Sequence, residues 1–272
     1  MFMQNVFKKL LLTLLLISPL TALAANTELT WYGHAAFKLT TPSGKVLMID
    51  PWITNPANSN GQEDLAKIDK ADLILITHGH GDHIGDSVAI AKKTGAQLVS
   101  TFDLGKALAQ YGGYPAEQTG MATMGNFGGE LSLLDGEVKI AFIPAIHSSS
   151  VAGPEGTKDI HDGGNPGGFL ITVKNGPSIY HTGDTDVFGD MALIKQFHKV
   201  DVMLAAIGGH FTMGPERAAK AVKLVEPRMV IPMHFGTFPI LTGTPQALEQ
   251  ALKAEHSKAK VKAMTIGETI KL

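Results

Sequence analysis

The chain has 272 residues, of which 44% are hydrophobic and 18% are charged, a composition typical of a globular protein and not of a disordered one. Its formal net charge is −2 and no basic cluster follows residue 9, which argues against nucleic acid as a partner. There is no cysteine, which excludes disulfide bonds, a cysteine nucleophile and thiolate metal ligands.

The first 24 residues have the features of a secretory signal peptide. Two lysines precede an apolar stretch from Leu10 to Ile17, and an Ala-Leu-Ala tripeptide ends the segment. The apolar stretch is too short to span a bilayer comfortably. We therefore expect a signal peptide at residues 1–24, one domain at residues 25–272, and an exported, periplasmic protein with no stable membrane insertion after cleavage. An uncleaved N-terminal anchor is the alternative.

The first half of the remaining chain begins with short apolar runs separated by turns and then alternates strand and helix patterns. Strands are expected at residues 28–31, 46–49, 73–77 and 96–100, helices at residues 84–93 and 104–111, and a strand pair within residues 119–129. Residues 55–69 are polar and are expected to form a loop. The alternation of strand and helix predicts layers of α and β structure.

The second half continues this pattern. Strands are expected at residues 138–144, 169–173, 178–181, 201–207, 229–233 and 261–270, and helices at residues 188–198, 215–225 and 245–256. Residues 148–168 are rich in Ser, Gly and Pro and are expected to form a long loop, of the kind that borders a substrate pocket. His161 within this loop is expected to be exposed to solvent.

Potential metal ligands are concentrated directly after the strand at residues 73–77. The pattern H-x-H-x-D-H places four of them within six residues: His78, His80, Asp82 and His83. Glycines between them allow a tight turn that aims several side chains at one point. Imidazole and carboxylate suit Zn²⁺ and similar first-row divalent ions. A polar surface loop with chance histidines is the alternative, and this spacing disfavours it.

Three further potential ligands also follow apolar runs of strand type: His147, Asp184 and His234. One edge of a sheet can therefore gather all seven. Seven nitrogen and oxygen donors exceed the four of a tetrahedral Zn²⁺ site and suit two metals that share a carboxylate. Asp50, at the end of the strand at residues 46–49, is expected to orient one of the ligand histidines through a hydrogen bond.

The order and spacing of these residues resemble the metallo-β-lactamase superfamily of hydrolases. The matching elements are the segment THGHGDH at residues 77–83, then His147, then Gly183-Asp184-Thr185, then His234. The resemblance covers essentially the whole chain after residue 24. It implies an α+β fold, namely a four-layer αββα sandwich with the site at one edge of the two sheets.

The resemblance also implies a ligand assignment. One metal would be held by His78, His80 and His147, the other by Asp82, His83 and His234, and Asp184 would bridge them. We therefore expect two divalent metal ions. Zn²⁺ is the first choice, and a donor set without sulfur also accepts Mn²⁺, Fe²⁺ or Ni²⁺, depending on supply.

Three other segments resemble a subfamily of uncharacterised metal-dependent hydrolases. They are GHAAF at residues 33–37, IGGHFTMGP at residues 207–215 and PMHFGTFP at residues 232–239. This group neighbours the ascorbate-6-phosphate lactonases and the N-acylphosphatidylethanolamine phospholipases D, and its closeness argues against β-lactamase activity. Its members are generally cytoplasmic, so the expected export signal is a departure that argues against a cytoplasmic phosphosugar substrate.

The implied activity is hydrolysis of a small molecule. A hydroxide that bridges two metals would attack an ester, lactone or similar carbonyl bond, because metal-bound water has its pKa lowered toward about 7. Asp82 is expected to orient this nucleophile. His34 and His210 are candidates for contacting the oxyanion or protonating the leaving group, since histidine titrates near neutral pH. Thr212 is a weaker candidate.

Two other functions remain open. A phosphodiesterase or phospholipase D-like hydrolase would use the same metals, but phosphate recognition favours several cationic side chains, and Arg217 is the closest one that the sequence offers. A non-catalytic metal-binding module is the second alternative, which the complete ligand set disfavours. A redox di-iron protein of this fold would carry an acidic residue where His80 stands. The sequence does not indicate an oligomeric state.

Overall fold

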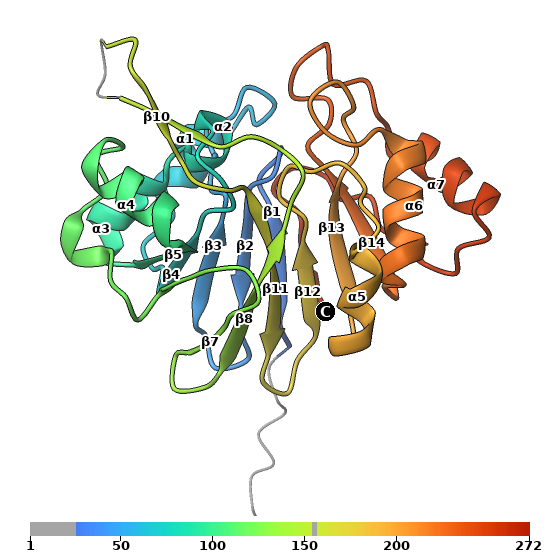
Figure 1. Cartoon of the computed structure of the whole chain (residues 1–272), viewed down its shortest axis with the longest axis horizontal. Helices are drawn as coiled ribbons and strands as arrows, with labels where there is room; N and C mark the ends of the chain where they lie inside the picture. The colour runs from blue at the N-terminus through green and yellow to red at the C-terminus, as the bar shows by residue number, and fades with distance from the viewer. Residues whose placement is uncertain (1–25, 154–156) are drawn as a thin grey trace, which may run out of the picture.

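The computed structural model describes residues 26–153 and 157–272, so the expected signal peptide at residues 1–24 lies outside the described residues. Two seven-stranded sheets face each other, and helices cover the outer face of each sheet (Figure 1). The predicted α+β, four-layer αββα sandwich is thereby confirmed. Within the described residues, no helix combines the length and apolar character needed to cross a membrane.

The first sheet contains mainly the N-terminal strands, in the order β16-β1-β2-β3-β4-β5-β6. Their bounds are β1 (Glu28–Trp31), β2 (Phe37–Thr40), β3 (Val46–Ile49), β4 (Leu73–Leu75), β5 (Gln97–Thr101), β6 (Met124–Gly125) and β16 (Thr269–Lys271). Pairing is antiparallel from β16 to β3 and parallel from β3 to β6.

The second sheet has the order β15-β14-β13-β12-β11-β8-β7. Its strands are β7 (Glu130–Leu133), β8 (Val138–Pro144), β11 (Gly167–Val173), β12 (Ser178–His181), β13 (Val202–Ala206), β14 (Met229–Met233) and β15 (Lys260–Val261). It mirrors the first sheet, because β7, β8, β11 and β12 pair antiparallel and β12 to β15 pair parallel.

Helices α3 and α4 pack on the outer face of the first sheet, and α5, α6 and α7 pack on the outer face of the second. The helices are α1 (Gly61–Ala66), α2 (Gly81–Ile84), α3 (Ser87–Thr94), α4 (Phe102–Gln110), α5 (Met191–Phe197), α6 (Pro215–Val225) and α7 (Pro245–Ala254). A short 3₁₀ turn (Ala116–Gln118) follows α4, and a separate hairpin is formed by β9 (Ser150–Ala152) and β10 (Ile160–Asp162).

The central strands are buried on both faces, which explains their unbroken apolar runs. In β4, Leu73 and Leu75 face the core between the two sheets, whereas Ile74 points to the core under α3 and α4. In β13, Val202 and Leu204 likewise face the inter-sheet core. Successive side chains of a strand point to opposite faces. One apolar strand therefore contributes side chains both to the core between the sheets and to the core between its sheet and the helices.

The strands that precede the predicted ligands run in the same direction within their own sheet. In the first sheet β3 and β4 are parallel, and in the second β12, β13 and β14 are parallel. Strand β8 shares their direction because it is antiparallel to β11, which is antiparallel to β12. Their carboxyl ends therefore meet at one edge of the sandwich, and this topology brings the dispersed ligands together.

Two expectations for the N-terminal half need correction. The loop expected at residues 55–69 contains helix α1. The helix expected at residues 84–93 is present as α3, but it begins at Ser87 and is separate from the single turn α2. The break lies at Gly85, which has φ of 41° and lies so close to Trp52 that an added Cβ would be 2.5 Å from its Cα.

Three other expectations were wrong. The strand pair expected at residues 119–129 is reduced to β6, and the chain then turns, with Gly128 at φ of 84°. The loop expected at residues 148–168 contains the β9–β10 hairpin. The strand expected at residues 261–270 is two strands, because Gly267 turns at φ of 83°, and β15 and β16 join different sheets.

Candidate metal centre

All seven predicted ligands lie together at the sheet edge, and His34 joins them. Ligand-type atoms lie within 4.8 Å of one another in three groups: His78, His80 and His147; His34, Asp82, His83 and His234; and His78, His83 and Asp184. The first two groups share no residue. The residues of the third come from helix α2 and from the loops that follow β4 and β12.

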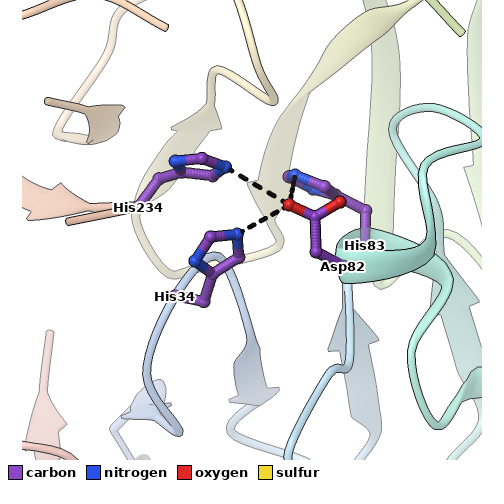
Figure 2. Close-up of side chains that lie close together, drawn as sticks. All are labelled: His34, Asp82, His83 and His234. Carbon is purple, nitrogen blue, oxygen red and sulfur yellow. Dashed lines mark hydrogen bonds and ion pairs between the residues drawn. The ribbon is translucent and has the colours of Figure 1, made fainter. Parts of the chain in front are cut away.

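The second group is assembled from both sheets (Figure 2). Asp82 and His83 lie in α2, His34 lies in the turn between β1 and β2, and His234 follows β14. His34 and His234 have φ of 50° and 55°, in the left-handed region that residues other than glycine rarely adopt. Such backbone is found preferentially at functional sites. Here it turns the chain sharply at a strand end and directs the imidazoles toward Asp82.

Buried Asp50 and Thr77 fix the orientation of two histidines. Asp50 accepts hydrogen bonds from Thr77 N (2.8 Å), Thr77 Oγ1 (2.7 Å) and His83 Nδ1 (2.7 Å). Because the Thr77 hydroxyl donates to Asp50, its oxygen accepts from His78 Nδ1 at 3.0 Å. When each ring is neutral, its proton therefore lies on Nδ1, which leaves Nε2 of His78 and His83 as the atom that can bind a metal. The expected hydrogen bond from Asp50 to a predicted ligand is present.

The first group consists of neutral imidazoles. His78 Nε2 lies 3.0 Å from His80 Nδ1. Burial lowers the pKa of His78 well below its ordinary value, and burial also lowers the pKa values of His80 and His147. Neutral imidazole is the form that binds transition metals.

Asp184 lies between the two groups. Its Oδ2 is 3.0 Å from His234 Nε2 and 3.6 Å from His147 Nε2, and its Oδ1 is 3.2 Å from His83 Nε2. His147 belongs to the first group and the other two histidines to the second. Asp184 is therefore within 3.6 Å of histidines from both groups.

The side chains fit a bound cation. His83 Nε2, His234 Nε2 and Asp184 Oδ1 are buried and have no hydrogen-bond partner, although they lie close together. Buried polar atoms in proteins are almost always paired, so a cluster of unpaired ones indicates a missing ion or ligand. Imidazole nitrogens and carboxylate oxygens are the donors that Zn²⁺ and related ions prefer.

The electrostatics of the second group also favour positive charge. Burial alone would lower the pKa of His234, but the Asp184 and Asp82 carboxylates raise it to about 9. Burial would likewise lower the pKa of His83, but Asp184 and Asp50 raise it well above its ordinary value. Burial would raise the pKa of Asp184, yet His234 and His83 hold it well below its usual range. Protons therefore occupy this group when no metal does.

His34 is held at both ring nitrogens and its side chain is 0% exposed. Nε2 lies 3.0 Å from Asp82 Oδ2, and Nδ1 lies 2.9 Å from Thr237 Oγ1. An ionised carboxylate only accepts, so Nε2 carries the proton and the Thr237 hydroxyl donates to Nδ1. Burial lowers the pKa of His34 to about 4, so the ring is neutral. The His34 carbonyl also accepts from His234 N at 3.0 Å.

The predicted candidates His210 and Thr212, as well as His161, lie outside the groups of converging atoms. His210 follows β13, is exposed, and contacts the Phe211 ring at 4.4 Å. Thr212 Oγ1 donates to the backbone of the next residue. His161 was expected to be exposed, but it is half-buried, because its ring stacks on Tyr111 with 3.5 Å between centroids.

Sequence reasoning missed the hydroxyl groups around the centre. Thr77 and Thr237 hold His78 and His34, and Ser148 Oγ lies 3.4 Å from His80 Nε2. Ser149 Oγ accepts from Gly79 N and fastens the segment after His147 to the ligand loop. Thr77 and Ser148 could have been found from the sequence, because each is adjacent to a predicted ligand. No sequence pattern links Thr237 to His34.

Comparison with known proteins gives consistent matches. Residues 28–234 match the β-lactamase superfamily domain. A UPF0173 metal-dependent hydrolase of Thermodesulfovibrio yellowstonii is 57% identical over 265 residues, which cover 97% of this chain and 99% of that protein. One from Anaeromyxobacter dehalogenans is 53% identical over 251 residues, covering 92% and 88%. The solved structure of Igni18, a metallo hydrolase from the archaeon Ignicoccus hospitalis, is 38% identical with a TM-score of 0.78, covering 91% and 99%.

Proposed function

This chain belongs to the β-lactamase superfamily and is a metal-dependent hydrolase, and we propose that it uses two divalent ions, with Zn²⁺ the first choice, to cleave an ester, lactone or similar carbonyl bond. One observation carries the proposal. Two groups of ligand-type atoms that share no residue flank Asp184, whose oxygens lie within 3.6 Å of both.

The proposed ligand assignment follows these groups. His78, His80 and His147 hold one ion, Asp82, His83 and His234 hold the other, and Asp184 bridges them. His34 is assigned a different role from that expected. Because its ring is buried and both nitrogens are engaged, it orients Asp82 and does not protonate a leaving group.

A divalent ion at this place supplies Lewis acidity and lowers the pKa of a water bound to it. The side chains of the protein orient the attacking water. Asp82 is the most exposed carboxylate of the centre, with 31% of its side chain accessible, so it can accept a hydrogen bond from an attacking water. The hydrogen bond from His34 fixes which Asp82 oxygen is left for that purpose.

The arrangement disfavours the two alternatives. Arg217 donates to Asp186 from both Nε and Nη2, so it is engaged elsewhere. Among the described residues, no lysine or arginine forms an ion pair with the carboxylates of the centre, which argues against a phosphodiester substrate. Partial exposure of Asp82 argues against a purely structural metal site, since such sites are closed.

Metal content tests the proposal. Purified protein is expected to hold about two equivalents of divalent metal by elemental analysis. His147→Ala and His234→Ala should each lose about one equivalent, and Asp184→Ala should weaken both. His198→Ala, a histidine outside the centre, is the matched control and should keep both ions. Wild-type protein without bound metal, and without a metal-dependent rise in thermal stability, would contradict the proposal.

Export is also proposed. The supporting features are the apolar stretch and the Ala-Leu-Ala pattern within residues 1–24. The match to the Thermodesulfovibrio protein covers 97% of this chain, so it extends into this segment. Expression of the full chain in a Gram-negative host should yield periplasmic protein with a new N-terminus at Ala25, and Leu14→Arg should block this. Full-length protein in the membrane fraction would instead support an uncleaved anchor.

A further inference from the structure

The centre is open to solvent on one side. Asp82 is 31% exposed and His147 is 13% exposed. The deeper residues of the centre are closed off: His78, His83, Asp184 and His234 are all buried. A substrate therefore approaches over the side where Asp82 and His147 lie.

An aromatic wall, formed by Trp52 and Phe238, packs against His34. The centroids of the two rings lie 6.0 Å apart. The centroid of the His34 ring lies 5.4 Å from that of Trp52 and 6.2 Å from that of Phe238. His34 in turn donates to Asp82 at 3.0 Å. Phe238 is 38% exposed, and Ile240 in the same loop is 45% exposed. Apolar surface is thus presented to solvent one side chain away from the centre.

Exposed apolar residues also lie in the segments that follow β8 and β13. Ile146 directly precedes His147, Phe211 lies in the loop after β13, and each is more than half exposed. Neighbouring residues hold these two segments: Asp186 N donates to Ile146 O at 3.1 Å, and Met213 N donates to Thr185 O at 3.2 Å. Grouped exposed apolar residues mark binding sites on soluble proteins.

Within residues 26–153 and 157–272, no lysine or arginine forms an ion pair with Asp82 or Asp184. Arg217, which lies at the start of α6 beyond Phe211, is engaged by Asp186. Exposed apolar side chains, together with the engagement of Arg217 by Asp186, suit an uncharged molecule with a hydrocarbon portion.

We infer that the substrate is an uncharged carbonyl ester or lactone whose acyl chain is apolar and packs against Phe238 and Ile240. The inference rests on the proposed function and adds the class of substrate. Burial of hydrocarbon on the aromatic wall and Ile240 strengthens binding with each added methylene. Long-chain substrates are therefore preferred over short ones.

A homologous series of p-nitrophenyl esters, from acetate to octanoate, tests the inference on the metal-loaded full chain. We expect kcat/KM to rise about two- to fourfold for each added methylene until the chain extends beyond Ile240. Phe238→Ala and Ile240→Ser should flatten this dependence. Phe197→Ala is the matched control, because Phe197 is 75% exposed but lies on α5, away from the loops that carry the centre (Figure 1). It should leave the dependence unchanged.

Binding without turnover provides an independent readout. The chain has two tryptophans, and Trp31 is buried in the core, so a change in fluorescence on ligand binding reports on Trp52. 2-Decanone is expected to change the emission at concentrations at least tenfold below acetone, and Trp52→Phe should remove the response.

The possible outcomes separate the inference from the function on which it rests. Metal-dependent hydrolysis with equal kcat/KM along the series, or faster cleavage of bis-p-nitrophenyl phosphate than of any ester, would overturn the inference and leave a metal-dependent hydrolase. Absence of metal-dependent ester hydrolysis would overturn the proposed carbonyl chemistry as well. A steep chain-length dependence that Phe238→Ala flattens supports both.

Discussion

The His34 imidazole donates a hydrogen bond of 3.0 Å to the Asp82 carboxylate inside the protein. The same ring is held by Thr237 from the other half of the chain, at 2.9 Å. The His34 carbonyl also binds the backbone of His234. One residue thus fixes a proposed ligand from each sheet, and the precision of the centre depends on it.

Substitution of His34 tests this role. His34→Ala should lower kcat/KM and metal affinity by about 10- to 100-fold, because Asp82 loses the donor that orients it. His34→Gln should recover much of this loss, since an amide can donate to Asp82. Thr237→Ser should behave like wild type, whereas Thr237→Val should resemble a milder His34→Ala. Metal affinity is measured by competition with a chelator. Equal loss in His34→Gln and His34→Ala would show that His34 is itself a metal ligand.

Asp50 is expected to contribute to both stability and metal binding. It is fully buried and accepts three hydrogen bonds. Asp50→Asn keeps the size but places an amide where only acceptors fit, so the free energy of unfolding should fall by about 2–4 kcal/mol and metal affinity by at least tenfold. Urea unfolding measures the free energy of unfolding. Asp69→Asn, at an exposed site, is the control and should change neither.

The metal-free protein should lose stability as the pH rises from about 6.5 to about 9. Burial would lower the pKa of His234, but Asp184 raises it from 6.5 to about 9. A raised pKa in the folded state means that protonated His234 stabilises the fold fully below pH 6.5, and that this contribution is lost through pH 9. The metal-loaded protein should not show this loss, because the ion replaces the proton. Coincident pH profiles of urea midpoints for the two forms would contradict the prediction.

Metal affinity should increase over the same pH range. A metal that binds at His83 and His234 must displace protons from two histidines whose pKa values are raised by neighbouring carboxylates. Calorimetric titrations at pH 6, 7 and 8 should therefore show rising affinity and proton release that depends on the buffer. An affinity independent of pH would exclude these two residues as ligands.

Gly183 is expected to be irreplaceable in the turn before Asp184. Its φ is 60°, and an added Cβ would lie 2.3 Å from Gly167 O. Gly267 provides a matched control, because its φ is 83° but an added Cβ would meet nothing within 4 Å. Gly267→Ala should cost about 1–2 kcal/mol from backbone strain alone. Gly183→Ala should cost a further 1–3 kcal/mol or so from overpacking and should also lose metal, since Asp184 moves. An equal loss of unfolding free energy in Gly183→Ala and Gly267→Ala, measured by denaturant unfolding, would contradict this account.

The convergence of the proposed ligands was predictable from the sequence, because they follow strands whose apolar runs are themselves recognisable. The segment at residues 77–83 and the strands before His147 and His234 were found in this way, and parallel strands bring such ends together. The role of His34 was not predictable, because its partner Thr237 is 203 positions away and only the fold makes them neighbours. A pairwise contact of this kind leaves no local pattern.

The elements that were predicted incorrectly share a different cause. Apolar content at the C-terminus indicated a single strand, but the turn at Gly267 divides it between two sheets. The break at Gly85 depends on the approach of Trp52, which local propensity does not register. Stacking on Tyr111 similarly determines the burial of His161. In each case tertiary contacts override a local preference.

The pairing of β16 with β1 has a consequence for the order in which the chain can fold. Thr30 and Thr269 bond across this pair although they are 239 positions apart. While the chain is being synthesised, β1 therefore has one edge without a partner until residues 269–271 have left the ribosome. The first sheet can be completed only after that point, and long-range pairing of this kind makes folding slow. Removing the four residues after Glu268 would leave β1 as a permanent free edge, the type of strand that recruits other chains and aggregates.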